Sequence, residues 1–246
     1  MGVNNYEKLM SFFKDPSKED FDDVAKFLLK YGGIKKKIRK EYEKESFVYY
    51  RFKEIEFYLY DIKDENNIRL NKDGESEIIN DCPTFNRNCK AGEWFFHNYG
   101  VDIAFETFTR KNEGYTELTK FGGILIRSVE RLDDGIVICG PKRCLAEIFN
   151  GTTALPEVCT LPENYESSSD DGEITILKDK RVLGKSWEHK YGADLPYRYY
   201  VADTDWERER EQIYEQKNKD KNEYHVILKT CPYKYKDKPL DQGERI

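Results

Sequence analysis

Two carboxylates and a phenol alternate within a short aromatic segment, and they are the first candidates for chemistry. Glu54, Glu56 and Tyr58 stand two positions apart in FVYYRFKEIEFYLY, residues 47–60. The β-branched and aromatic content predicts a strand, in which alternate side chains share one face and lie roughly 7 Å apart at their backbones. A carboxylate whose pKa is raised by burial can serve as a general base. A solvated face with alternating charges fits the same pattern, so both interpretations stay open.

A lone arginine interrupts a second apolar segment, ILIRSV. Arg127 must either reach solvent from a sheet edge or pair with a buried acid, because a buried guanidinium without a partner costs too much free energy. In a functional role, Arg127 pairs with the Glu56 cluster or with the attacking water of that cluster. In a structural role, the same arginine forms a plain ion pair.

Aromatic and basic residues form two further candidate groups. The run GEWFFHNYG, residues 92–100, is dense enough in aromatic residues to be core or to stack on an unstacked base. His97 within it can stack or exchange a proton. The lysine-rich run at 35–40 is a solvated surface or a phosphate contact.

Composition limits the function classes. The chain has 246 residues and a formal net charge of −6. This charge argues against a protein that binds long nucleic acid through net charge alone, but it permits a local basic face. Charged residues make up 36%, and 18 Tyr and 14 Phe must build much of the core. The six cysteines show no C-x-x-C pair and only three His are present, so we expect no metal site, and the expected compartment favours reduced thiols. We expect no cofactor either.

Membrane and export signals are not expected in this sequence. No run approaches the roughly 18 consecutive apolar residues of a membrane span. The start MGVNNYEK has no basic segment followed by an apolar one. We therefore expect a nuclear or cytoplasmic protein that is not secreted.

Short strands and few helices are expected to position these residues. Ser17 is suited to cap a helix that ends at Gly32-Gly33, and a second short helix follows Gly140-Pro141. Besides 47–60, the predicted strands are 94–97, 101–108, 124–129, 174–177 and 197–202. Polar residues predict a loop or irregular hairpin at 61–81 and a loop at 164–173. This pattern favours a single α+β domain with a mostly antiparallel sheet.

The order of these motifs resembles that of the alkyladenine (3-methyladenine) DNA glycosylases. The resemblance runs from residue 11 to about 203 through SFFKDPSKEDFDDVAKFLLKYGG, KEIEFYLYD, GEWFFHNYG with VDIAFE, GGILIRSVERLDDG, CGPKRCLAEI and LPYRYYV. It implies a curved, mostly antiparallel sheet flanked by helices, similar to the fold shared with formyltransferase C-terminal domains. It places a glycosylase-like domain at 1–206 and a charged extension at 207–246.

The resemblance also implies a mechanism and a set of site residues. Such a protein is a monofunctional, metal-free glycosylase, acting as a monomer on damaged duplex DNA, that flips a damaged purine and hydrolyses its bond to the sugar. Glu56 matches the general base, and Arg127 matches the arginine that helps hold the water. The implied base-binding residues are Tyr58, Phe85, His97 and Asp102. Tyr99 is implied to be the side chain inserted into the duplex. The implied phosphate contacts are Lys35, Lys36, Lys37, Arg39 and Arg87.

Three positions depart from the family pattern. Phe85 stands where the family has a histidine, His97 where it has a tyrosine, and Asp102 where it has an asparagine. One hypothesis is that an anionic Asp102 favours a cationic alkylated base through charge attraction. Two other functions stay open: a non-catalytic nucleic-acid-binding protein on the same fold, and a nucleoside or nucleotide N-glycosidase.

Overall fold

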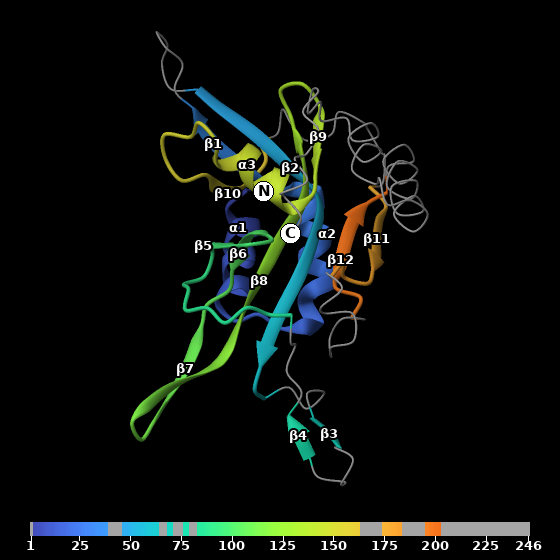
Figure 1. Ribbon diagram of the computed structural model, residues 1–246. Helices are drawn as coiled ribbons and strands as arrows, with labels where there is room; N and C mark the ends of the chain where they lie inside the picture. The colour runs from blue at the N-terminus through green and yellow to red at the C-terminus, as the bar shows by residue number, and fades with distance from the viewer. Residues whose placement is uncertain are drawn as a thin grey trace, which may run out of the picture.

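Two long antiparallel strands, β2 (Ser46–Asp61) and β8 (Tyr115–Arg131), organise the computed structural model of this chain (Figure 1). They belong to a ten-stranded sheet in which every pairing between described strands is antiparallel. The structure describes residues 2–38, 46–63, 68–70, 76–78, 83–162, 174–183 and 195–202. The predicted α+β class with a mostly antiparallel sheet in one domain is therefore confirmed.

The shorter strands extend this sheet on both sides. Beyond β2 lie β1 (Gly32–Ile38), β10 (Glu157–Thr160), β12 (Arg198–Val201) and β11 (Ile176–Asp179). Beyond β8 lie β6 (Gly100–Ala104), β5 (Trp94–His97), β7 (Phe108–Asn112) and β9 (Ile136–Cys139). A separate hairpin pairs β3 (Ile68–Leu70) with β4 (Ser76–Ile78), within the segment predicted to be a loop or irregular hairpin.

Helices α1 (Gly2–Lys14) and α2 (Phe21–Tyr31) cover the sheet from behind in Figure 1, and the 3-10 turn η1 (Lys18–Asp20) joins them. Aromatic rings fill the layer between helices and sheet, as the composition requires. Phe21 stacks on Phe57 at 4.4 Å between ring centroids, and Phe12 meets Phe105 edge to face at 5.3 Å. Such aromatic pairs add to the stability already gained by burial.

Most predicted elements are present, with two informative differences. The strand predicted at 101–108 is divided, because the chain leaves the ladder after β6. Phe105 is buried in the core there, and the Glu106 amide donates to the Phe13 carbonyl of α1. Ser17 does cap a helical start, accepting from the Glu19 amide at 3.3 Å, but the first turn is η1 rather than α-helix.

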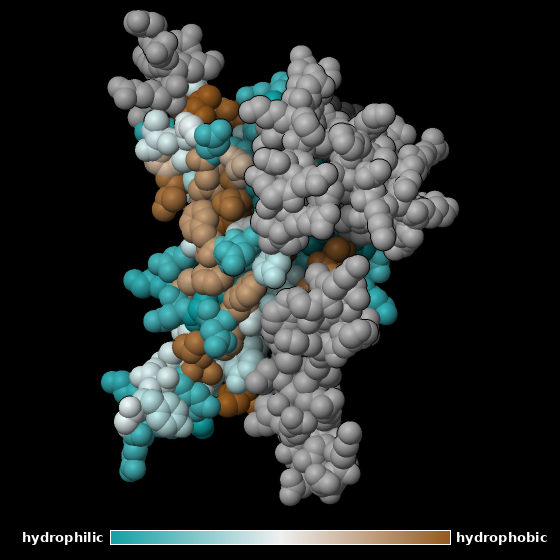
Figure 2. Space-filling view, in the orientation of Figure 1, coloured by the Kyte–Doolittle hydropathy of each residue, from teal (hydrophilic) through white to brown (hydrophobic). Residues whose placement is uncertain are grey.

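The short helix α3 (Pro141–Phe149) lies where the Gly-Pro signal predicts it, and it packs near the β5–β6 edge. On the face shown in Figure 2, apolar surface gathers in this region between hydrophilic borders. Phe96, Tyr99 and Leu155 are among the large apolar side chains that are exposed. No helix in the described part of the chain is long and apolar enough to cross a membrane.

Candidate active site

The register of five strands places Glu56, the predicted general base, and Asp102, a predicted base-binding residue, on one face of the sheet. Arg198 of β12 pairs with Glu56 of β2, which pairs with Leu125 of β8. Leu125 pairs in turn with Asp102 of β6, and Asp102 with Phe95 of β5. Residues directly opposite each other in antiparallel strands point to the same face, so this row is continuous. Glu56 and Asp102 lie two strands apart, roughly 10 Å at the backbone.

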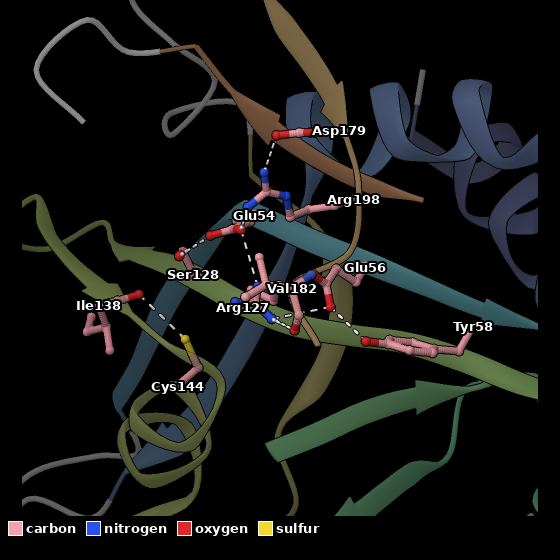
Figure 3. Close-up of polar contacts among 10 residues, drawn as sticks. All are labelled: Glu54, Glu56, Tyr58, Arg127, Ser128, Ile138, Cys144, Asp179, Val182 and Arg198. Atoms are coloured by element: carbon pink, nitrogen blue, oxygen red, sulfur yellow. Dashed lines mark hydrogen bonds and ion pairs between the residues drawn. The ribbon is translucent and has the colours of Figure 1, made fainter. Parts of the chain in front are cut away.

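A β-bulge aims Arg127 at the carboxylates. Glu54 pairs with Ser128 and Ile55 pairs with Ile126, so Arg127 is the extra residue between them. Such an insertion re-aims a side chain, and here two consecutive residues of β8 reach the same acid. Arg127 Nε donates to Glu54 Oε1 at 3.2 Å, and Ser128 Oγ donates to Oε2 at 3.1 Å (Figure 3).

Glu56 is the central acceptor of the site. Its side chain is 0% exposed, and three groups donate to it from different elements (Figure 3). Tyr58 Oη reaches Oε2 at 2.7 Å, Arg127 Nη1 reaches the same oxygen at 3.2 Å, and the Val182 amide reaches Oε1 at 2.8 Å. A buried carboxylate is tolerated only with such pairing and hydrogen bonding. The interpretation of this strand face as solvated is wrong.

Tyr58 remains a hydrogen-bond donor over the whole physiological range. Burial, and then the negative charge of Glu56, raise the pKa of the Tyr58 phenol well above its ordinary value. The Arg181 guanidinium lies 4.7 Å from the centre of the Tyr58 ring and donates to the Phe57 carbonyl at 3.3 Å. The phenol therefore keeps its proton and donates it to the carboxylate.

Glu54 extends the same network toward the sheet edge. It is buried, and Arg198 Nη1 lies 3.6 Å from its Oε1 while Arg198 Nη2 bonds Asp179 of β11 (Figure 3). Glu54 therefore shares Arg127 with Glu56 instead of facing water. The sequence predicted Glu56, Tyr58 and Arg127 and left Glu54 undecided, and the structure brings all four together.

Val182 and Arg181 were missed by the sequence analysis. They come from the stretch after β11, which carries no motif beyond the basic residues of KDKR. Only tertiary packing brings the Val182 main chain against Glu56, and its carbonyl also accepts from Arg127 Nη1 at 3.5 Å. No local sequence signal marks such a contact.

The other predicted base-binding residues form a second cluster around Asp102. This side chain is 2% exposed, and its Oδ2 accepts from Arg87 Nη1 at 2.7 Å while its Oδ1 lies 3.0 Å from His97 Nε2. Phe85 contacts His97 at 5.0 Å and stacks on Tyr99 at 5.9 Å between centroids, with planes 18° apart. Tyr99, predicted to enter the duplex, is 44% exposed.

The predicted phosphate contacts are dispersed. Lys36 is buried in β1 and donates to the Glu147 carbonyl at 2.6 Å, and burial lowers its pKa. Lys35 Nζ lies 4.2 Å over the Phe47 ring, and Lys37 is partly exposed on the same strand. Arg87 lies inside the second cluster. Arg39, like the segments 164–173 and 207–246, lies outside the described residues.

Comparisons with known proteins add no family to this geometry. No protein-family model matches the chain, and no curated protein matches it. Among the residues that the structure describes, no group of three or more His, Cys, Asp or Glu side chains could hold a metal ion. The glycosylase resemblance therefore depends on the order of the motifs in the sequence.

Proposed function

We propose that this protein is a hydrolase of N-glycosyl bonds that flips a damaged purine out of duplex DNA and removes it, on an alkyladenine DNA glycosylase-like fold. The observation that carries the proposal is the convergence of Tyr58 and Arg127 on the fully buried carboxylate of Glu56. These are the positions matched to the general base, a base-binding aromatic and the arginine that holds water. The proposed substrate is damaged duplex DNA, bound by a monomer without a cofactor.

The hydrogen-bond geometry supports a general base. Glu56 Oε1 accepts one hydrogen bond, from the Val182 amide, and a carboxylate oxygen has two lone pairs. The remaining lone pair can accept a hydrogen from water, and Arg127 Nη1, which donates to the Val182 carbonyl at 3.5 Å, is the group that we propose helps hold that water. As the water oxygen bonds to the anomeric carbon, its proton passes to Glu56 and the electrons of the carbon–nitrogen bond leave with the base.

The aromatic cluster supplies the surface for the base. Enzymes that act on a base within a duplex must extrude it, and aromatic stacking recovers about 1–3 kcal/mol per base. Phe85, His97 and Tyr99 lie together on the Asp102 side of the same face as Glu56. A base held there would bring its sugar toward the carboxylate two strands away.

Base release from defined duplexes tests the proposal. Oligonucleotide duplexes containing hypoxanthine, ethenoadenine or 7-methylguanine are incubated with wild type and with Glu56→Gln, and released bases are quantified by mass spectrometry. We expect Glu56→Gln to lower the rate about 10²–10⁴-fold, because a glutamine cannot take the proton of water. Absence of release from every duplex, or equal release by Glu56→Gln, overturns the assignment.

One observation favours a non-catalytic nucleic-acid-binding protein as the second candidate. Protein groups already donate three hydrogen bonds to Glu56, which satisfies its charge without any ligand. Tight, salt-dependent binding to lesion or abasic duplexes without turnover would establish this alternative. Release of hypoxanthine from free deoxyinosine, with none from duplex DNA, would instead indicate a nucleoside N-glycosidase.

A further inference from the structure

The charge of Asp102 is compensated inside the protein. Arg87 Nη1 lies 2.7 Å from Asp102 Oδ2, and the two side chains are 1% and 2% exposed. Arg87 is fixed further by its Nε bond to the Phe85 carbonyl at 3.1 Å and by the Phe95 ring, 4.1 Å from Cζ. A carboxylate with a guanidinium at this distance presents little net charge to a third group.

His97 is hydrogen-bonded to the second carboxylate oxygen of Asp102, and its two hydrogen bonds together indicate which ring nitrogen carries the proton. The Tyr99 amide donates to His97 Nδ1 at 3.2 Å, so Nδ1 carries a lone pair and not a proton. The ring proton therefore lies on Nε2, which donates to Asp102 Oδ1 at 3.0 Å. Both Asp102 oxygens are thus engaged by protein groups, Oδ2 by Arg87 and Oδ1 by His97. The ring surfaces of His97, Phe85 and Tyr99 lie beside this pair and can stack on a base.

Arg87 lies on the side of Asp102 that faces the Glu56 cluster. Gly123 of β8 pairs with Tyr58 on one side and with Ala104 on the other. A Cβ at Gly123 would lie 2.7 Å from Arg87 Nη1 and 3.2 Å from Asp102 Cβ. The Arg87 guanidinium therefore lies over Gly123, between the two clusters. Because glycine has no side chain, the guanidinium has room there.

We infer that Arg87, Asp102 and His97 form a charge-neutral recognition element that makes the protein select uncharged damaged purines over cationic alkylated ones. This inference rests on the proposed glycosylase function and names its substrate class. It reverses the hypothesis drawn from Asp102 alone, in which an uncompensated carboxylate attracts a cationic base. A positively charged base would lose its hydration in a desolvated site without gaining an uncompensated carboxylate in return, whereas a neutral base would retain its stacking on Phe85 and Tyr99.

The test compares release of hypoxanthine, which is uncharged, with release of 7-methylguanine, which is cationic in DNA. For each protein the two rates are measured at one ionic strength, corrected for spontaneous loss, and expressed as a ratio relative to wild type. Arg87→Gln leaves Asp102 uncompensated and is expected to lower this ratio about tenfold, while Asp102→Asn leaves Arg87 uncompensated and is expected to raise it. The double variant restores charge balance and is expected to stay within about threefold of wild type.

Arg110→Gln is the matched control, because it removes an arginine from an exposed ion pair with Glu117 and should leave the ratio unchanged. Circular dichroism and urea unfolding check that each variant is folded. If Arg87→Gln fails to fold, the opposite shift in Asp102→Asn and its reversal in the double variant still decide the question. Base release with ratios that are equal in all variants, or a wild type that releases 7-methylguanine alone, overturns this inference. No release from any duplex overturns the proposed function itself.

Discussion

Two sets of the same three residue types take their tyrosine and arginine from the same two strands. In both, a tyrosine of β2 and an arginine of β8 meet one glutamate. The inner triplet is Tyr58, Glu56 and Arg127, and the outer triplet is Tyr50, Glu147 and Arg131. Their donor distances are similar: 2.7 and 3.2 Å to the inner carboxylate, 3.0 and 2.8 Å to the outer one.

The glutamates differ in what holds them and in how much water they meet. Glu147 belongs to α3 and its side chain is 11% exposed, and its arginine also pairs with Asp134 at the surface. The outer triplet therefore ties a helix to the sheet. Glu56 belongs to a central strand, is 0% exposed, and is bound in addition by the main chain of Val182.

The comparison shows that chemical composition alone does not identify a site. Burial and the neighbouring glutamate raise the tyrosine pKa in both triplets, so perturbed ionisation does not separate them. The inner triplet differs because it shares a sheet face with Asp102, His97 and the exposed Tyr99. The functional role of the inner triplet is therefore supported by its position on the same sheet face as the Asp102 cluster, and not by its three residue types alone.

The largest expected difference between the triplets is catalytic. Glu147→Gln should release damaged bases at close to the wild-type rate, whereas Glu56→Gln should lose about 10²–10⁴-fold, the usual contribution of a general base. Both variants replace a carboxylate that accepts from a tyrosine and an arginine, so they are matched in chemistry. Single-turnover base release measures the difference. Comparable losses in the two variants would mean that structural damage, and not base chemistry, explains the effect.

A second difference is expected in stability. Arg127→Met leaves the fully buried Glu56 without its cation, which should lower the free energy of unfolding by about 3–5 kcal/mol. Arg131→Met removes a partly exposed guanidinium from the outer triplet and should cost about 1 kcal/mol. Urea unfolding at neutral pH gives both values. Equal losses would contradict the view that the inner carboxylate depends on its arginine more strongly.

The sequence predicted the inner triplet but not the contacts that complete it. Period-two alternation in β2 placed Glu54, Glu56 and Tyr58 on one face, and that face is as predicted. The bulge that aims Arg127 has no local signature, because it follows from the register between β2 and β8. Val182 approaches from a segment far along the chain, so only the folded structure reveals it.

For two basic residues the structure differs from the sequence-based prediction, because Lys36 and Arg87 are buried. The lysine-rich run at 35–40 predicts a solvated surface or a phosphate contact, yet GGIKKKI forms β1 between β2 and β10, and pairing on both sides buries Lys36. Tertiary pairing outweighs the weak strand propensity of lysine there. Arg87, a phosphate contact by the resemblance, lies instead against Asp102, a buried partner 15 positions away that only the folded structure reveals.

The smallest expected effect concerns the two tyrosines at alkaline pH. Because the pKa of Tyr50 and that of Tyr58 are raised in the folded protein, each phenol keeps its proton there while the unfolded chain loses it above about pH 10. The stabilisation is therefore fully present below pH 10 and is lost as pH rises further, by up to about 1.4 kcal/mol per pH unit for each tyrosine.

Tyr50→Phe and Tyr58→Phe should each reduce this alkaline loss, measured as the difference in urea unfolding free energy between pH 9 and pH 11. Tyr115→Phe is the control, because that ring is 63% exposed and should leave the pH dependence as in wild type. If only Tyr58→Phe also slows base release, the two triplets are alike in ionisation and differ in function. If the pH dependence of the unfolding free energy were unchanged in both variants, burial would not raise the pKa of Tyr50 and Tyr58 as described.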